Sequence, residues 1–234
     1  LFGVSVYFGN VLDAVLGIFI ACSLPAAVVC DRIYHPFEKP VKDSDRRLLL
    51  DEARREWSFY LDRVTAEDNF LPPDNVQYSP VFRVSHRTSP TNIGMYLLSC
   101  VGAAELGFID NARLETMLSR TVTTVESLPK YRGSLYNWYS TDELKVLSPF
   151  VSSVDSGNFL CCLVAVRRKL IEDIPDSPLI RRIGKLIDGA DVGAFYNRSR
   201  KLFSVGIDAD TGKKAPNCYD MLMSEARMLS YFAI

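Results

Sequence analysis

Three times along this chain, a short polar stretch leads directly into an apolar, helix-like segment. The stretches lie at residues 80–98 (PVFRVSHRTSPTNIGMYLL), 151–158 (VSSVDSGN) and 217–227 (NCYDMLMSEAR). Between them lie segments with the charged stripe of a half-exposed helix, and this alternation is typical of paired inner and outer helices. We therefore predict an all-α fold, the first half of a helical toroid, with a polar mouth at one end. A mouth of this chemistry suits a sugar.

The expected helices alternate between charged and apolar composition. Amphipathic, outer helices are expected at residues 44–64, 111–128 and 177–192, and helices that are apolar nearly all round, and so buried on every side, at 90–106, 155–170 and 219–234. Two further segments, residues 135–147 and 201–216, read as short β-hairpin excursions. Each comes just before an inner helix, so both are expected at the same end, where loops on a rigid scaffold often carry function.

The first thirty residues carry almost no charge. Asp13 is the only charged residue in 1–30, and residues 14–30 approach the length of a membrane-spanning helix. Because they show no polar stripe, we predict a membrane segment that contacts lipid through residues 1–30. A core helix interrupted at Pro25 is the alternative.

The predicted domains are residues 1–42, a membrane segment with its linker, and residues 43–234. The linker is indicated by charges and prolines in residues 31–43. Because the chain begins without methionine and stops inside an apolar stretch, we expect it to be a fragment whose second domain is truncated at the C-terminus.

Composition excludes several classes of function. With 27 basic and 28 acidic residues and no basic block, the chain lacks the electrostatic footprint of nucleic-acid binding, so we expect no nucleic-acid partner. The six cysteines show no paired metal-type spacing and are read as reduced, structural thiols. Neither histidine belongs to a Cys/His cluster. We therefore expect no metal site and no organic cofactor.

Glu225 is the most informative carboxylate, because it interrupts a helix otherwise committed to burial. A buried ionised group must be paired or must line a wet cavity. Two hypotheses stay open: an active-site carboxylate, or an ion pair with Arg227 or another arginine. Asp155 and Asp220 lie where helices begin, so each is a candidate ligand of the substrate or a plain helix cap.

Two polar clusters are candidates for sugar binding. His86 and Arg87 offer forked donors, although they can equally tie their loop to helix ends. Asn137 and Trp138 combine an amide with an aromatic face that suits stacking on a pyranose ring, although a tryptophan between helices is more often core.

Six ordered blocks resemble the cyclic β-1,2-glucan synthases, large bacterial membrane proteins with a glycoamylase-like domain. The blocks are EDNFLPPDN (67–75), SHRTSPTNIGMYLLS (85–99), YNWYST (136–141), VSSVDSGN (151–158), RKLFSVGID (200–208) and YDMLMSEAR (219–227). The resemblance covers residues 44–234 and implies an (α/α)6 toroid of which this chain supplies the first six helices. It also implies a location in the bacterial plasma (inner) membrane, with the toroid on the cytoplasmic side.

The activity that the resemblance implies is transglycosylation, in which a linear β-1,2-glucan is cut and joined into a ring. Glu225 resembles the catalytic nucleophile, with the acid/base partner beyond Ile234 and the fragment inactive by itself. The residues then expected to bind β-1,2-glucan are His86, Arg87, Asn92, Asn137, Trp138, Asp155, Asn158, Tyr219, Asp220 and Arg227. Alternatives are a β-1,2-glucan hydrolase or phosphorylase, and a non-catalytic glycan-binding helical domain.

Overall fold

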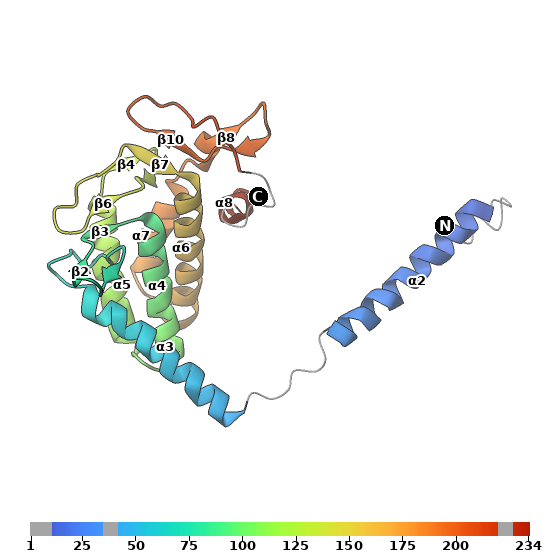
Figure 1. The fold of residues 1–234 in the computed structure, drawn as a ribbon, viewed down its shortest axis with the longest axis horizontal. Coiled ribbons are helices and arrows are strands. Elements are labelled where there is room, and N and C mark those ends of the chain that lie inside the picture. The colour runs from blue at the N-terminus through green and yellow to red at the C-terminus, as the bar shows by residue number, and fades with distance from the viewer. Residues whose placement is uncertain (1–10, 35–41, 220–226) are drawn as a thin grey trace. The chain divides into compact units, whose positions relative to one another are not determined.

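The structure, a computed structural model, describes residues 11–34, 42–219 and 227–234. The chain divides into two compact units, Leu1–Leu49 and Leu50–Ile234. Helix α2 (Val11–Tyr34) belongs to the first unit and runs through Pro25 without interruption (Figure 1). Its apolar side chains are exposed within this unit, Phe19 by 73%, and the alternative of a core helix stays a prediction.

No helix among the residues described is both long and apolar enough to cross a membrane. The membrane segment expected within residues 1–30 stays a prediction that this structure does not support. The domain boundary expected at residue 42 also stays a prediction.

The helices that follow lie close to the predicted ranges. Their bounds are α3 (Asp43–Arg63), α4 (Pro90–Glu105), α5 (Asn111–Ser127), α6 (Ser153–Asp173), α7 (Leu179–Asp188), the 3-10 turn η1 (Val192–Phe195) and α8 (Arg227–Phe232). The last helix was expected to begin at Tyr219, but Tyr219 lies outside any helix, and residues 220–226 lie outside the described part of the chain.

Helices α4 and α6 form the centre of the second unit and run parallel. Their first turns meet through Thr91 and Asp155, and toward their C-terminal ends Glu105 of α4 forms an ion pair with Lys169 of α6. Gly94 allows this close approach, because a Cβ there would lie 3.1 Å from the Cα of Phe159. Both helices begin at the end of the unit where the short strands gather (Figure 1).

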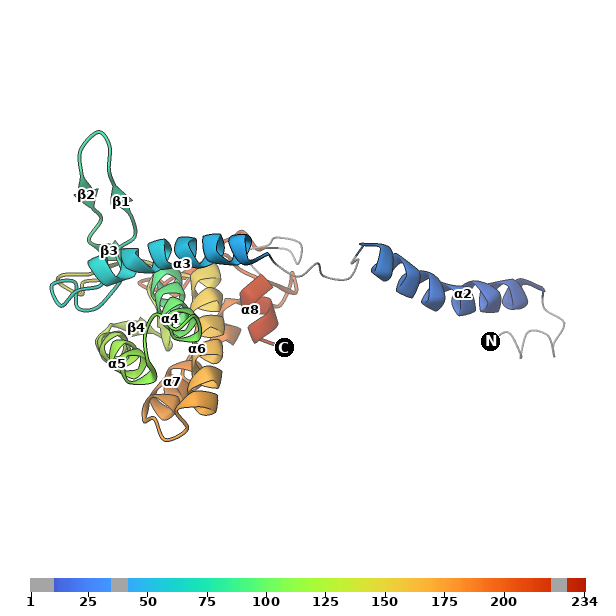
Figure 2. The ribbon, with the colours of Figure 1, turned by 90° about the horizontal axis from the view of Figure 1, so that it is seen from below.

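The flanking helices build a second layer. Helix α5 packs against α4, α7 packs against α6, and α5 and α7 pack against each other. Helix α8 packs on α6 (Figure 2). Helix α3 contacts α4 through Tyr60 and Tyr96, whose ring centroids are 5.2 Å apart. The alternation of inner and outer helices predicted from the sequence is therefore present in α4 to α7.

Local sequence signals explain where the inner helices begin. Ser89 and Ser152 are the N-caps of α4 and α6, and their hydroxyls accept from the backbone N–H groups of Asn92 and Asp155. Pro90 occupies the first helical position of α4, where its fixed φ and missing N–H do no harm.

The prediction that the inner helices are buried on every side is only partly correct. Their faces toward each other and toward α5 and α7 form the main core, in which Ile93, Leu97 and Leu163 are fully buried. Met95 of α4 and Val164 of α6 are instead 47% and 46% exposed.

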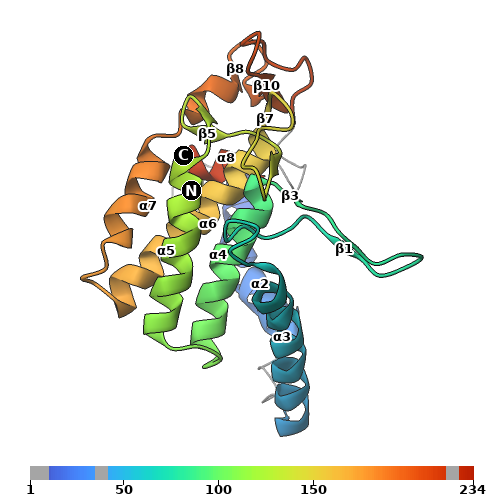
Figure 3. The same cartoon turned by 90° about the vertical axis from the view of Figure 1, so that its left-hand side faces the viewer.

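The strands form five two-stranded antiparallel sheets in the described residues. The pairs are β1 (Val76–Gln77) with β2 (Arg83–Val84), β3 (Arg87–Thr88) with β6 (Tyr139–Ser140), β4 (Lys130–Tyr131) with β5 (Ser134–Leu135), β7 (Phe150–Ser152) with β10 (Gly206–Asp208), and β8 (Tyr196–Asn197) with β9 (Leu202–Phe203). The two expected excursions are present, and each turns back on itself through an antiparallel bridge. The β1–β2 hairpin, which the sequence did not predict, projects away from the helices (Figure 3).

Candidate functional site

A polar cluster lies where α4 and α6 begin. Thr91 Oγ1 donates to Asp155 Oδ1 at 2.6 Å, and Asn158 Nδ2 donates to Thr91 Oγ1 at 3.2 Å. The cap of α6 is Ser152, so Asp155 is free to turn its carboxylate toward α4. This excludes the simple N-cap hypothesis for Asp155.

The loop between β5 and β6 adds Asn137 and Trp138 to this cluster. In the amide orientation that satisfies both neighbours, Asn137 Nδ2 donates to Asp155 Oδ2 at 2.7 Å, and Asn137 Oδ1 accepts from Trp138 Nε1 at 2.9 Å. Both carboxylate oxygens of Asp155 therefore accept hydrogen bonds.

The buried side chain of Tyr139 holds this loop in place. Its hydroxyl accepts from the backbone N–H of Tyr136 and donates to the carbonyl of Pro129, both at 2.7 Å. Burial raises the pKa of the Tyr139 hydroxyl, which keeps it protonated as a donor. The loop that presents Asn137 and Trp138 is therefore fixed by a buried contact.

The guanidinium of Arg87 lies over the ring of Trp138. Its Cζ is 4.3 Å from the ring centroid of Trp138, and its Nε and Nη2 donate to Asp74 Oδ2 at 3.2 and 2.9 Å. Asp74 also accepts from Asn92 Nδ2 at 3.4 Å. One face of Trp138 is therefore covered by the guanidinium, and only the other face can stack on a sugar ring.

His86 lies at the edge of the same cluster and contacts the buried carboxylate of Asp68. Its Nδ1 lies 2.8 Å from Asp68 Oδ1, which also accepts from the hydroxyl of Thr141. The backbone N–H of Thr141 donates to the carbonyl of His86 at 3.1 Å. These three residues form a closed ring of hydrogen bonds.

The structure thus brings together seven of the residues predicted to bind substrate. They are His86, Arg87, Asn92, Asn137, Trp138, Asp155 and Asn158. We call this group, with Asp68, Asp74, Thr91 and Thr141, the polar cluster. Asp68 and Thr141 of this cluster are buried, and its other side chains are partly or fully exposed. The positive, N-terminal ends of the dipoles of α4 and α6 lie at the cluster. Such a surface offers many donors and acceptors to a hydroxyl-rich ligand.

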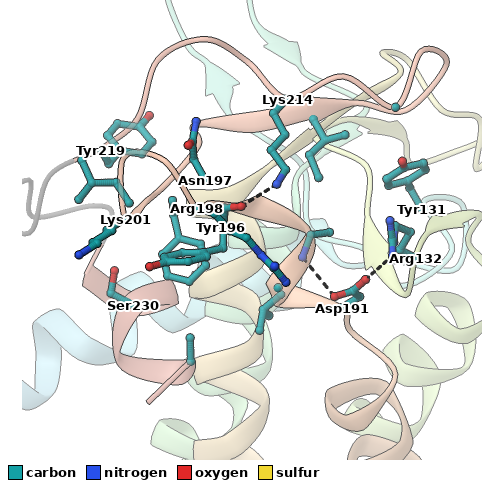
Figure 4. A pocket seen from close by; sticks show the side chains of 18 of the residues that line it. Tyr131, Arg132, Asp191, Tyr196, Asn197, Arg198, Lys201, Lys214, Tyr219 and Ser230 are labelled. Carbon is teal, nitrogen blue, oxygen red and sulfur yellow. Dashed lines mark hydrogen bonds and ion pairs between the residues drawn. The ribbon is translucent and has the colours of Figure 1, made fainter.

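Tyr219 lies apart from the polar cluster. Tyr219 lines a separate cavity of about 1150 Å³ beneath the β8–β9 hairpin, shown in Figure 4. Tyr131 and Tyr196 also line this cavity, and Arg132 forms an ion pair there with Asp191 at 2.8 Å. Of the predicted site residues in the described part of the chain, only Tyr219 lines it.

The predicted catalytic residue, Glu225, and Asp220 lie outside the described residues. Arg227 is the first residue of α8. The catalytic assignment of Glu225, and its alternative as an ion-pair partner, therefore stay predictions.

Four members of the polar cluster were not predicted from the sequence to have a role. Asp68 and Asp74 belong to the block at residues 67–75. Two acids on either side of a Pro-Pro pair could have indicated a polar site there. Thr91 and Thr141 gave no signal, because single threonines are common at helix starts and in turns. Within the described ranges, no group of three or more His, Cys, Asp and Glu side chains is placed to hold a metal ion.

Comparison with known proteins identifies a relative by sequence and several by fold. No protein-family model matches the chain. The cyclic β-(1,2)-glucan synthase NdvB of Rhizobium meliloti (strain 1021) is 46% identical over 148 residues, which are 63% of this chain and 5% of the synthase. The chain therefore spans only a small part of the length of this relative.

Three solved structures share the fold at low sequence identity. A candidate glucoamylase of Bacteroides caccae matches with a TM-score of 0.64 and 15% identity, over 80% of this chain and 47% of that protein. An endo-β-1,2-glucanase of Chitinophaga pinensis, in complex with sophorotriose and glucose, matches with 0.60 and 14%, over 79% and 46%. A β-1,2-glucanase of Parabacteroides distasonis matches with 0.55 and 13%, over 70% and 24%.

The predominantly helical fold is therefore shared with glucoamylase-like proteins. The resemblance to the cyclic β-1,2-glucan synthases predicted from the sequence is confirmed, since this chain is similar to a segment of one of them.

Proposed function

We propose that this chain is a β-1,2-glucan-processing domain whose polar cluster binds the glucan. The observation that carries the proposal is the continuity of the cluster from Asp74 through Arg87, Trp138 and Asn137 to Asp155. The likeness to a cyclic β-1,2-glucan synthase supplies the substrate class.

The chemistry of the cluster fits a neutral, hydroxyl-rich chain. Asn158 and Asn92 present amides, Arg87 retains donors not used by Asp74, and Trp138 retains one aromatic face. Amides and one aromatic face recognise a pyranose by hydrogen bonding and stacking. Asp155 already accepts from Thr91 and Asn137, which suits a residue that orients the cluster rather than one that transfers a proton.

Transglycosylation is the reaction that we propose for this domain, with Glu225 as the nucleophile. The Glu225 carboxylate would attack the anomeric carbon, the glycosidic C–O bond would break, and a second carboxyl group would protonate the leaving oxygen. A hydroxyl at the other end of the same glucan would then displace Glu225, giving a ring and returning the proton. The proposal for Glu225 rests on its sequence block.

Binding by the chain itself is the first test. Trp57 and Trp138 are the two tryptophans, and Trp57 is buried. In the Trp57→Phe variant the tryptophan emission, excited selectively over that of the tyrosines, therefore comes from Trp138 alone. A β-1,2-linked glucooligosaccharide should change this emission saturably, and substitution of Asn158 by Ala should weaken the effect. An emission that no oligosaccharide changes would contradict the proposed site.

The reaction is tested in a chimera of the Rhizobium meliloti synthase in which this chain replaces the matching segment. Glu225→Gln should stop ring formation while linear glucan still accumulates, and normal ring formation would remove Glu225 from the mechanism. Shorter linear products from the unaltered chimera would favour a hydrolase. Phosphate-dependent release of glucose 1-phosphate would favour a phosphorylase. Glucan binding without any turnover would favour the non-catalytic glycan-binding domain.

A membrane partner for residues 1–30 is a separate part of the proposal. Val15, Phe19 and Val29 of α2 are each more than half exposed, which supports contact with lipid. Flotation of the chain with liposomes should depend on these residues, and Phe19→Ser with Val15→Ser should reduce it. Equal flotation of both proteins would contradict lipid contact through α2.

A further inference from the structure

Asp68 is a buried carboxylate beneath an exposed imidazole. Asp68 is 6% exposed, whereas the side chain of His86 is 56% exposed. Oδ1 of Asp68 takes both neighbours, His86 Nδ1 at 2.8 Å and the hydroxyl of Thr141. A buried carboxylate needs such partners, because an unpaired one is costly.

The turn that carries Asp68 has an unusual backbone. Asn69 and Phe70, which follow it, have φ values of 52° and 58°, in the left-handed region that residues other than glycine seldom adopt. Strain of this kind persists only where the surroundings fix it, and it gathers at functional sites.

The surroundings fix this turn from two sides. Asn69 Nδ2 donates to the carbonyls of Thr141 and Asp142 at 2.8 and 2.9 Å. From α5, the hydroxyls of Thr121 and Thr124 donate to the carbonyls of Phe70 and Asn69 at 2.8 and 2.7 Å. The Asp68 carboxylate is therefore held in one position relative to the loop that carries Thr141.

This geometry decides which imidazole nitrogen of His86 faces solvent as an acceptor. When Nδ1–H donates to a carboxylate, the neutral ring carries its proton on Nδ1 and a lone pair on Nε2. We infer that Asp68 is a positioning residue that holds His86 in the Nδ1–H tautomer, so that Nε2 accepts a hydrogen bond from a hydroxyl of the bound glucan. The inference rests on the proposed function, because the ligand is the glucan proposed above.

A purely structural Asp68 would behave differently. It would tie the turn to the Thr141 loop whether or not His86 were present, and its loss would act on stability alone. A positioning residue acts on the ligand only through His86. The tautomer of His86 and the coupling between the two residues separate these two roles.

The tautomer can be read directly, because His35 and His86 are the two histidines of the chain. Long-range ¹H–¹⁵N correlation spectra, recorded where imidazole is neutral, should show His86 protonated at Nδ1, with a His35→Gln variant giving the assignment. Asp68→Ala should shift His86 to the Nε2–H form that a free imidazole side chain prefers. Glu67→Gln, an exposed neighbouring acid, should change nothing. A wild-type His86 protonated at Nε2, or an unchanged Nδ1–H tautomer in Asp68→Ala, would overturn the inference.

Binding supplies the second readout. Asp68→Ala and His86→Ala should each weaken binding of a β-1,2-linked glucooligosaccharide by about three- to tenfold, and the double variant should bind no worse than His86→Ala alone. If the double variant lost affinity by the product of the two single losses, Asp68 would not act through His86. If the unaltered chain bound no oligosaccharide, the proposed function would fail, and a glucan hydroxyl could not be the group that donates to His86 Nε2. The tautomer of His86 would still decide whether Asp68 positions the ring. If circular dichroism shows that Asp68→Ala does not fold, the tautomer of His86 in the wild-type chain tests the inference without a substitution.

Discussion

Thr91 donates its hydroxyl hydrogen to Asp155 across 2.6 Å, and this bond joins the first turn of α4 to the first turn of α6. At the far end, Lys169 of α6 pairs with Glu105 of α4. Two helices fastened at both ends keep their positive N-terminal dipoles at the same polar cluster. The geometry of the cluster is therefore set by packed helices, and the loops complete it.

Asp155→Ala should lower the free energy of unfolding by about 1–3 kcal/mol, because Thr91 and Asn137 both lose their acceptor. Urea unfolding measures the change, and oligosaccharide binding should weaken in the same variant. Asp176→Ala, at an exposed acid, is the control and should stay within about 0.5 kcal/mol of the unaltered chain. Equal losses in the two variants would show that the bonds of Asp155 contribute nothing.

Gly157 and Gly102 should respond to alanine with opposite signs. A Cβ at Gly157 would lie 2.5 Å from the backbone nitrogen of Leu229, so α8 must move away from α6 and stability should fall by about 1–3 kcal/mol. A Cβ at Gly102 of α4 meets nothing within 4 Å, and alanine there should add about 0.5–1 kcal/mol through its higher helix propensity. Denaturant melts of both variants check the pair, and a stabilising Gly157→Ala would refute the described seating of α8.

The pair of Glu126 and Arg182 should make stability depend on pH. Arg182 Nη2 lies 2.6 Å from Glu126 Oε2 and joins α5 to α7. The hydrogen bond from Arg182 lowers the pKa of the Glu126 carboxyl from its ordinary value of 4.5. The contribution is therefore complete above pH 4.5 and is lost as the pH falls through the lowered pKa.

Glu126→Gln should consequently cost up to about 1 kcal/mol at pH 7, since the pair is partly exposed, and close to nothing once Glu126 is protonated. Unfolding curves from pH 7 to pH 2 measure this difference. Glu172→Gln, in an exposed pair within α6, is the control and should cost about 0.3–0.5 kcal/mol at pH 7. A loss at Glu126 that does not change with pH would contradict the ionic origin of the effect.

The thiols should fall into two classes of reactivity. Burial raises the pKa of Cys100 to about 12 and that of Cys162 to about 11, whereas Cys22 and Cys30 are exposed. Because the thiolate is the reactive form, a maleimide or iodoacetamide at pH 8 should label Cys22 and Cys30 in the native protein. Mass spectrometry should find Cys100 and Cys162 labelled only after unfolding. Rapid labelling of native Cys100 would contradict the described core.

The helices of the second unit could be predicted well because caps and periodicity are local signals. Ser89 followed by Pro90 marks the beginning of α4, and the observed helix ends one residue before the predicted end. Burial was predicted less well. Met95 and Val164 are as apolar as their buried neighbours, and which side of an apolar helix finds a partner depends on tertiary packing that composition does not encode.

The polar cluster was predicted as separate groups rather than as one connected site. The sequence singled out His86 with Arg87 and Asn137 with Trp138, but no spacing rule shows that β3 pairs with β6 and brings these groups together. Asp68 and Asp74 were passed over for the same reason, because their partners are distant in sequence. Only the fold turns Asp74 toward Arg87 and Asp68 toward His86.

The most direct test of the account is a crystal structure of the chain soaked with a β-1,2-linked glucooligosaccharide. A pyranose should lie against the face of Trp138 that Arg87 does not cover, with sugar hydroxyls within hydrogen-bond distance of Asn158 and of His86 Nε2. Sugar bound only in the separate cavity beneath the β8–β9 hairpin, or a polar cluster that stays without sugar at saturating ligand, would contradict it.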